Sequence, residues 1–201
     1  LYHLEPAWLP GGFVGVDVFF VISGFVVTAS LAGHRHEGLG SFLAGFYARR
    51  LLRLMPALLL TLLVTATAYV LLVPPAWFNR ATASVALSAF WGLSNWALDQ
   101  QEVNYFEPRA ELNPFTHTWS LGVEEQFYLL APVLLYGALR LHAGGRGRRL
   151  AERTIVALAL ASLTACMVVG FTQGARAVFY PVVFRFWELG AGVLLYLYRG
   201  A

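Results

Sequence analysis

Runs of about twenty apolar residues recur along the chain, and they limit its possible folds more than any other feature. A membrane-spanning α-helix needs about 20 predominantly apolar residues to cross the hydrocarbon layer of a bilayer. Residues 12–31, 51–73 and 179–198 meet this length, and 154–171 is slightly short but uncharged. Residues 119–139 also qualify if two glutamates are tolerated. Only 12% of residues are charged, about half the share of a soluble domain. The sequence therefore predicts an all-α fold, a polytopic transmembrane helical bundle.

The two ends of the sequence indicate a piece of a longer protein. The opening LYHLEP is typical of the last turn of a helix, and LYLYRGA directly follows an apolar run. We therefore expect 1–201 to be a single membrane domain, truncated at both ends, with about six membrane-crossing helices. The single cysteine, Cys166, excludes an internal disulfide and a cysteine-based metal site.

The positions of the arginines predict how the chain is oriented, because cytoplasmic loops collect Arg and Lys. The segments 32–50 and 140–153 are rich in arginine, so both are expected to be cytoplasmic loops. The segment 99–116 carries four acidic residues against one arginine. We therefore expect 99–116 to be an extracytoplasmic loop.

The run at residues 81–98 is shorter and richer in Ser, Thr and Asn than the other apolar runs. Two cytoplasmic loops must be separated by an even number of crossings, and 51–73 and 119–139 already supply two. We therefore predict that 81–98 does not cross the membrane. It is expected to lie at the outer interface, or to dip in and return under the protection of neighbouring helices.

Several ionisable residues fall in the outer layer of the predicted membrane region. Asp17 lies roughly 7–8 Å below the outer surface at 1.5 Å per residue, and Glu124 and Glu125 reach a similar depth. His3 and His117 lie near the same surface. A charge near the bilayer centre costs about 3 kcal/mol even on insertion scales, so such groups are functional candidates by default.

Structural roles compete with this functional interpretation. One of the two neighbouring glutamates is expected to be a helix N-terminal acid favoured by the macrodipole. Asp17 has the alternative of binding backbone amides of the turn at Gly11 and Gly12. His117, in NPFTHTWS, is equally compatible with either role.

Two groups of charged residues also lie at helix positions. Arg185 and Glu188 are three apart and can neutralise each other on one helix face, which favours a structural pair over the lining of a polar cavity. Arg49, Arg50 and Arg53 stand at a predicted helix start. They either anchor the cytoplasmic end or bind phosphate, since a guanidinium fits phosphate oxygens bidentately and a helix N-terminus favours anions.

Some motifs are absent. The chain has no Gly-rich phosphate-binding loop, no dinucleotide fingerprint and no HxxxxD pattern. The SLG around Ser120 lacks the preceding glycine of a nucleophile elbow, although Ser120 stays a further site candidate. The sequence thus supports neither nucleotide hydrolysis nor serine-hydrolase chemistry. We expect no metal and no nucleic-acid partner.

Four blocks of the sequence, in the right order, together resemble the acyltransferase-3 family of integral-membrane O-acyltransferases, bacterial enzymes that decorate cell-surface glycans. The blocks are YHLEPAWLPGGFVGVDVFFVISGF, FYARRLLRLMPAL, NPFTHTWSLGVEEQFYLLAP and FRFWELGAG. His3 fits the family's first-helix histidine, whose basic partner eleven positions upstream would precede residue 1. Arg50 and Arg53 match its RxxR pair, and residues 119–128 match its WSL.VE.QFY block. The full family domain has about ten spanning helices, so this chain is similar to its first half to two-thirds.

The resemblance implies transfer of an acyl group, acetyl being the expected one, in the bacterial cytoplasmic (inner) membrane. Acyl-coenzyme A would dock on Arg50 and Arg53, with Arg49 beside them. The acceptor would be a hydroxyl of an extracytoplasmic carbohydrate such as lipopolysaccharide, exopolysaccharide or peptidoglycan. A proton-coupled transporter of a glycan or lipid is the alternative, because buried charges also serve proton relays.

The resemblance also implies a role for His3. An imidazole, with an ordinary pKa of about 6.5, suits removal of the acceptor's proton at neutral pH. Whether His3 acts as a base or itself becomes acylated is left open. Asp17, Glu124 or Glu125 would orient the imidazole, as the aspartate of a catalytic triad does.

Overall fold

The computed structural model describes residues 14–33, 38–103, 112–140 and 146–199. Within these ranges the regular secondary structure is helical, without strands, which confirms the all-α prediction. His3 and the turn at Gly11 and Gly12 lie outside the described residues.

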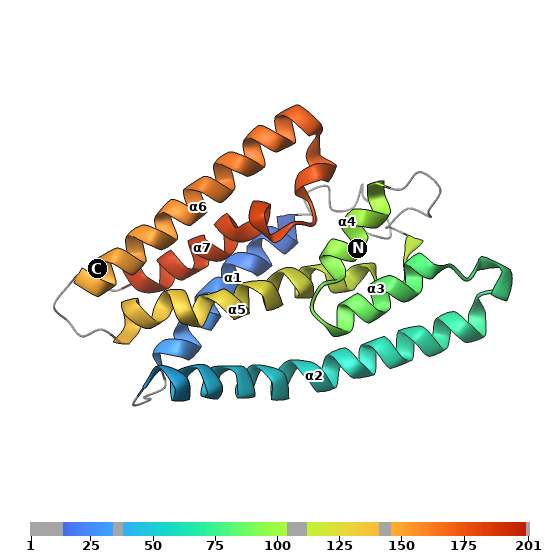
Figure 1. The fold of residues 1–201 in the computed structure, drawn as a ribbon, viewed down its shortest axis with the longest axis horizontal. Coiled ribbons are helices and arrows are strands. Elements are labelled where there is room, and N and C mark those ends of the chain that lie inside the picture. Colours follow the sequence, from blue (N-terminus) through green and yellow to red (C-terminus); the bar gives the residue numbers. More distant parts are fainter. Residues whose placement is uncertain (1–13, 34–37, 104–111, 141–145, 200–201) are drawn as a thin grey trace.

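The helices form an elongated bundle (Figure 1). In chain order they are α1 (Val14–Ala32), α2 (Leu39–Leu72), α3 (Arg80–Phe90), α4 (Ser94–Val103), α5 (Trp119–Arg140), α6 (Arg146–Gln173) and α7 (Val182–Tyr198). In Figure 1, α1, α5 and α7 lie in the middle, α2 runs along one side, α6 runs along the opposite side, and α3 and α4 sit at one end.

The two arginine-rich segments, predicted as loops, are partly helical. Helix α2 begins at Leu39 and not near residue 51, and α6 begins at Arg146, so much of 32–50 and 140–153 is helical. Arginine, leucine and alanine are good helix formers, so arginine-rich segments here continue the helices. Figure 1 shows the end of α1, the start of α2, the end of α5 and the start of α6 at one end of the molecule. Their cytoplasmic location stays a prediction.

The segment 81–98 folds as two helices, not as one. Helices α3 and α4 have 11 and 10 residues, about 15–16 Å each at 1.5 Å per residue, and neither alone matches a hydrocarbon layer of about 30 Å. Gly92 between them adopts a left-handed φ of 68°, which glycine reaches without steric cost. The predicted loop 99–116 is helical as far as Val103.

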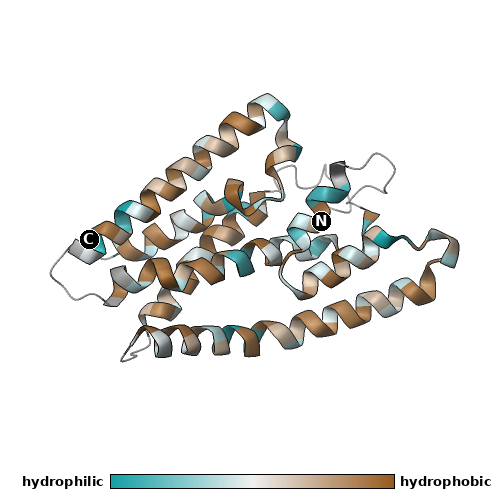
Figure 2. Cartoon of the chain, in the orientation of Figure 1, coloured by the Kyte–Doolittle hydropathy of each residue, from teal (hydrophilic) through white to brown (hydrophobic). Residues whose placement is uncertain are grey.

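Among the described residues, three helices are long and apolar enough to cross a membrane, against about six expected: Val14–Ala32, Leu39–Leu72 and Gly147–Gln173. Figure 2 shows hydrophobic residues along most of α2 and α6, which form two sides of the bundle. In α2, Leu60, Leu63 and Leu72 each have more than half of their surface exposed. Such an apolar outer surface fits contact with lipid. The number of crossings stays a prediction.

Packing between α1 and α7 depends on two glycines. A Cβ atom at Gly24 would collide with the carbonyl oxygen of Leu189, and one at Gly192 would collide with that of Val21. Small residues let helix backbones approach closely in membrane proteins. The close approach of the two helices brings Asp17 of α1 beside Arg185 of α7.

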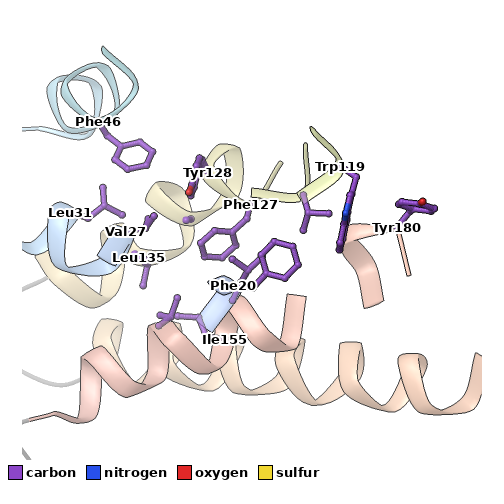
Figure 3. Close-up of a cluster of buried hydrophobic side chains, with 14 of the residues drawn as sticks. Phe20, Val27, Leu31, Phe46, Trp119, Phe127, Tyr128, Leu135, Ile155 and Tyr180 are labelled. Atoms are coloured by element: carbon purple, nitrogen blue, oxygen red, sulfur yellow. The ribbon is translucent and has the colours of Figure 1, made fainter. Parts of the chain in front are cut away.

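Buried apolar side chains from each of the helices α1 to α7 form one core. Figure 3 shows this cluster, in which Phe46 of α2 and Tyr128 of α5 approach each other above Val27 and Phe127. The rings of Phe46 and Tyr128 have centroids 6.5 Å apart in an edge-to-face arrangement. This core holds α2 against α5, where a pocket opens.

Candidate functional site

The first cluster of charged side chains joins α1 to α7 through Arg185. Its Nη1 donates to Oδ1 of Asp17 at 3.0 Å and to Oε1 of Glu188 at 2.9 Å. Its Nε donates to the carbonyl oxygen of Phe179 at 3.0 Å. The guanidinium carbon also lies 5.2 Å from the ring centroid of Phe179 and 5.8 Å from that of Trp119. Arg185 is therefore held by polar groups and by aromatic faces.

Two carboxylates share this single guanidinium. Glu188 is fully buried, and its Oε2 has no hydrogen-bond partner among the described residues. The predicted pair of Arg185 and Glu188 is confirmed. The second partner, Asp17, was not foreseen, since it lies 168 residues away in the sequence. The two partners predicted for Asp17, His3 and the glycine turn, fall outside the described residues.

Ser162 of α6 forms hydrogen bonds with the backbone of α7 next to this cluster. Its Oγ donates to the carbonyl oxygen of Val183 at 2.7 Å and accepts from the N–H of Trp187 at 3.1 Å. These are the two groups that an uninterrupted α-helix pairs with each other. The hydroxyl therefore contacts backbone groups of α7 on either side of Arg185 in the sequence. The hydrophobic pattern of the sequence does not indicate this contact.

The second cluster joins α1, α2 and α5. Glu124 is buried, and its carboxyl group lies within hydrogen-bonding reach of the hydroxyls of Ser23 and Tyr128. The Ser23 and Tyr128 hydroxyls are themselves hydrogen-bonded at 2.9 Å. The guanidinium carbon of Arg50 lies 4.2 Å from the ring centroid of Tyr128 and 5.7 Å from that of Phe46. The cluster thus combines a cation, a carboxyl group and two hydroxyls.

Glu125, next in the sequence, has different surroundings. Its side chain packs against the backbone of Gly92, where a Cβ atom would collide with Oε2. Its Oε1 is buried and has no hydrogen-bond partner among the described residues. The two glutamates, both predicted as site candidates, therefore have different neighbours. Glu124 faces α1 and α2, whereas Glu125 faces the turn between α3 and α4.

Gln126 fixes this turn against α5. Its Nε2 donates to the carbonyl oxygen of Gly92 at 3.1 Å and to Oδ1 of Asn95 at 2.7 Å. Its Oε1 accepts a hydrogen bond from Nε1 of Trp96 at 3.1 Å. Gln126 belongs to the block WSLGVEEQFY, and its side chain holds α5 to the turn between α3 and α4.

A pocket of about 400 Å³ lies between α2 and α5. Its volume falls in the range of small-molecule sites, roughly 300–1,000 Å³. The hydroxyl of Tyr47 donates to the carbonyl oxygen of Leu129 at 2.9 Å and ties the two helices together beside the pocket. The lining residues are Tyr47, Arg50, Leu51, Leu54, Met55, Glu125, Tyr128 and Leu129.

The three predicted phosphate-binding arginines do not stand at a helix start. Helix α2 begins at Leu39, so Arg50 lies about 16 Å along its axis. The macrodipole acts within the first turn and therefore adds nothing at these positions. Arg50 lines the pocket, Arg53 is exposed, and Arg49 is half-buried with its Nε unpaired within the described structure.

The remaining candidates, His117 and Ser120, lie on either side of Trp119, whose ring packs on Arg185. His117 is exposed in the short 3₁₀ turn Thr116–Thr118. Ser120 is half-buried in the first turn of α5 and does not line the pocket. In the part of the chain that the structure describes, no group of three or more His, Cys, Asp or Glu residues is placed to hold a metal ion.

The apolar helices, the buried charges and the pocket between α2 and α5 define a helical membrane protein with a candidate small-molecule site. The chain belongs to the acyltransferase-3 family, whose acyltransferase domain it matches over residues 2–200. It is similar to O-acetyltransferase OatA of Staphylococcus aureus strain NCTC 8325, with 37% identity over 90% of this chain and 29% of that protein.

A further S. aureus protein, from strain COL, carries a provisional O-acetyltransferase name. It is 43% identical over 67% of this chain and 22% of that protein. The chain thus spans less than a third of the length of the curated relatives that it matches. No solved structure matches it.

Proposed function

We propose that the chain forms the membrane part of an O-acetyltransferase. It would move an acetyl group from cytoplasmic acyl-coenzyme A to a hydroxyl of an extracytoplasmic carbohydrate in the bacterial inner membrane. Family membership supports acyl transfer, and similarity to O-acetyltransferases supports acetyl as the group. The observation that carries the proposal is that Arg50 and Glu125 line one pocket, a basic group for the donor and a carboxyl group for proton handling.

The lining of the pocket supports an acyl-coenzyme A donor. Such a donor joins anionic phosphates to a long, largely uncharged arm that ends in a thioester. Arg50 offers N–H groups suited to phosphate oxygens. Leu51, Leu54 and Met55 supply an apolar wall along which the arm would lie.

His3 supplies the base in this proposal. The acceptor oxygen attacks the thioester carbonyl, a C–O bond forms, and the C–S bond breaks. The imidazole takes the hydroxyl proton and returns one to the departing coenzyme thiolate. Glu125, whose Oε1 has no partner among the described residues, is a candidate to stabilise the protonated imidazole.

The test uses membrane vesicles that contain the full-length protein and receive labelled acetyl-coenzyme A on the cytoplasmic side. Label should reach an extracytoplasmic glycan, His3→Ala should abolish the transfer, and Arg50→Ala should raise the KM for the donor. The matched control is Arg176→Ala, because Arg176 is an exposed arginine far along the chain from the pocket.

Continued transfer in His3→Ala would remove that histidine from the mechanism. An equal rise in KM for Arg50→Ala and Arg176→Ala would remove the pocket as the donor site. Movement of an unmodified glycan without transfer of label would support the transporter alternative instead.

A further inference from the structure

Tyr128 lies where three helices meet around the pocket. From α5 its ring contacts Arg50 of α2, and its hydroxyl is hydrogen-bonded to Ser23 of α1 at 2.9 Å. Only 6% of Tyr128 is exposed, and that part lines the pocket. Figure 3 shows its side chain between α5 and Phe46 of α2. Tyr128 therefore connects the core to the pocket wall.

The guanidinium of Arg50 is held by aromatic rings. Its carbon lies 4.2 Å from the centroid of the Tyr128 ring and 5.7 Å from that of Phe46. Among the described residues no carboxylate lies within ion-pair distance of Arg50. A cation–π contact forms between the guanidinium charge and the ring face and uses no hydrogen-bond donor. The contact with Tyr128 therefore holds Arg50 without occupying its N–H groups.

The hydroxyl of Tyr128 fixes the ring that Arg50 stacks on. It is hydrogen-bonded to Ser23 and lies within reach of the carboxyl group of Glu124. A buried phenol with such partners has little freedom to rotate or withdraw. The hydroxyl and the ring therefore have separable tasks, the first anchoring and the second orienting.

We propose that Tyr128 is a positioning residue for the acyl donor. Its ring holds the guanidinium of Arg50 against the pocket wall, so that the N–H groups of Arg50 face an anionic group of the donor. This inference rests on the proposed function, since it takes Arg50 as the donor-binding group. Tyr128 would act through its contact with Arg50 and need not touch the donor itself.

The first test separates the ring from the hydroxyl by steady-state kinetics of the full-length protein. Tyr128→Leu removes the ring and should raise the KM for acetyl-coenzyme A about two- to thirtyfold, the span of cation–π energies. Its kcat should change little. Tyr128→Phe keeps the ring but removes its hydrogen bond to Ser23, so the KM should rise less than in Tyr128→Leu. Tyr136→Leu is the control, because Tyr136 is an α5 aromatic outside the pocket that packs on Phe42.

A second series keeps the shape of the side chain, so it stays informative if Tyr128→Leu does not fold. Starting from Tyr128→Phe, the phenylalanine is replaced by increasingly fluorinated phenylalanines, which weaken the negative ring face at nearly constant volume. Affinity for coenzyme A, measured by direct binding to the purified full-length protein, should fall with each added fluorine. An affinity independent of fluorination, or a loss in kcat alone, would overturn the positioning role.

Direct binding also distinguishes this inference from the proposed function. If the unaltered protein binds no coenzyme A, the donor assignment itself is wrong. If it binds coenzyme A, and the fluorinated and Tyr128→Leu variants bind equally well, the donor assignment stands and the role of Tyr128 is refuted.

Discussion

Arg185 contacts two carboxylates from different helices, and its removal would leave both without their cation. Glu188 is fully buried, so its charge would then lie in the protein interior uncompensated. Breaking a buried ion pair on one side costs about 3–5 kcal/mol. We expect Arg185→Ala to lower the unfolding temperature of the detergent-solubilised protein markedly in a thermal melt. Arg176→Ala, at an exposed position, should leave that temperature nearly unchanged.

A double variant tests whether charge is the cause of this loss. Arg185→Ala combined with Glu188→Gln replaces the uncompensated carboxylate by a neutral amide of the same shape, so part of the lost stability should return. A double variant no more stable than Arg185→Ala would show that the loss comes from the packing of Arg185 against Phe179 and Trp119.

For single side chains, the sequence predicts ion-pair partners that are near in the sequence and misses partners that are distant in it. The pairing of Arg185 with Glu188 follows from their spacing of three on a helix. Asp17 and Arg185 come together only because α1 packs on α7, and no periodicity records that packing. The contact of Ser162 with the backbone of α7 is missed for the same reason. The ion-pair partner of Asp17 follows only from the fold, and its predicted role at the site stays a prediction.

The contact between α1 and α7 depends on glycines that leave no room for a side chain. We expect Gly24→Ala to push the helices apart, because its Cβ would meet the backbone of Leu189. Overpacking of this kind costs about 1–3 kcal/mol, which thermal unfolding would record. The matched control is Gly15→Ala in the same helix, where nothing lies within 4 Å of the added Cβ. An equal loss of stability in both variants would contradict the close-packing explanation.

Helix extents were predicted well where hydrophobicity alone sets them. The runs 12–31 and 119–139 correspond to α1 and α5 within a few residues. At α2 the helix begins at Leu39 and not at the predicted residue 51, because arginine is a good helix former and does not end a helix. Phe42 and Phe46, both buried, extend the packed face of α2 beyond the apolar run. The three arginines therefore lie along the side of α2 and not at its start, and Arg50 lines the pocket there.

The predicted orientation of the whole molecule in the membrane depends on the number of crossings between the two arginine-rich segments. If both arginine-rich segments are cytoplasmic, an even number of crossings separates them, and α3 and α4 stay on the outer side. Both helices are individually too short to span. The geometry in Figure 1 fits, since the ends of α1 and α5 lie at one end of the bundle and α3 and α4 lie at the other.

Cysteine labelling in intact cells decides this orientation. Cys166→Ala removes the one thiol within residues 1–201, and any cysteine elsewhere in the full-length protein is likewise replaced. Phe90→Cys then places a thiol at the end of α3, and Leu150→Cys places one in the arginine-rich start of α6. Both positions are exposed in the bundle. A membrane-impermeant maleimide should label position 90 in intact cells and position 150 only after lysis. Labelling of both positions in intact cells, or of position 150 alone, would show that the segment from α3 to α4 crosses the membrane or that the sidedness is reversed. If the sidedness is reversed, the donor would have to reach Arg50 from the side opposite to the one proposed.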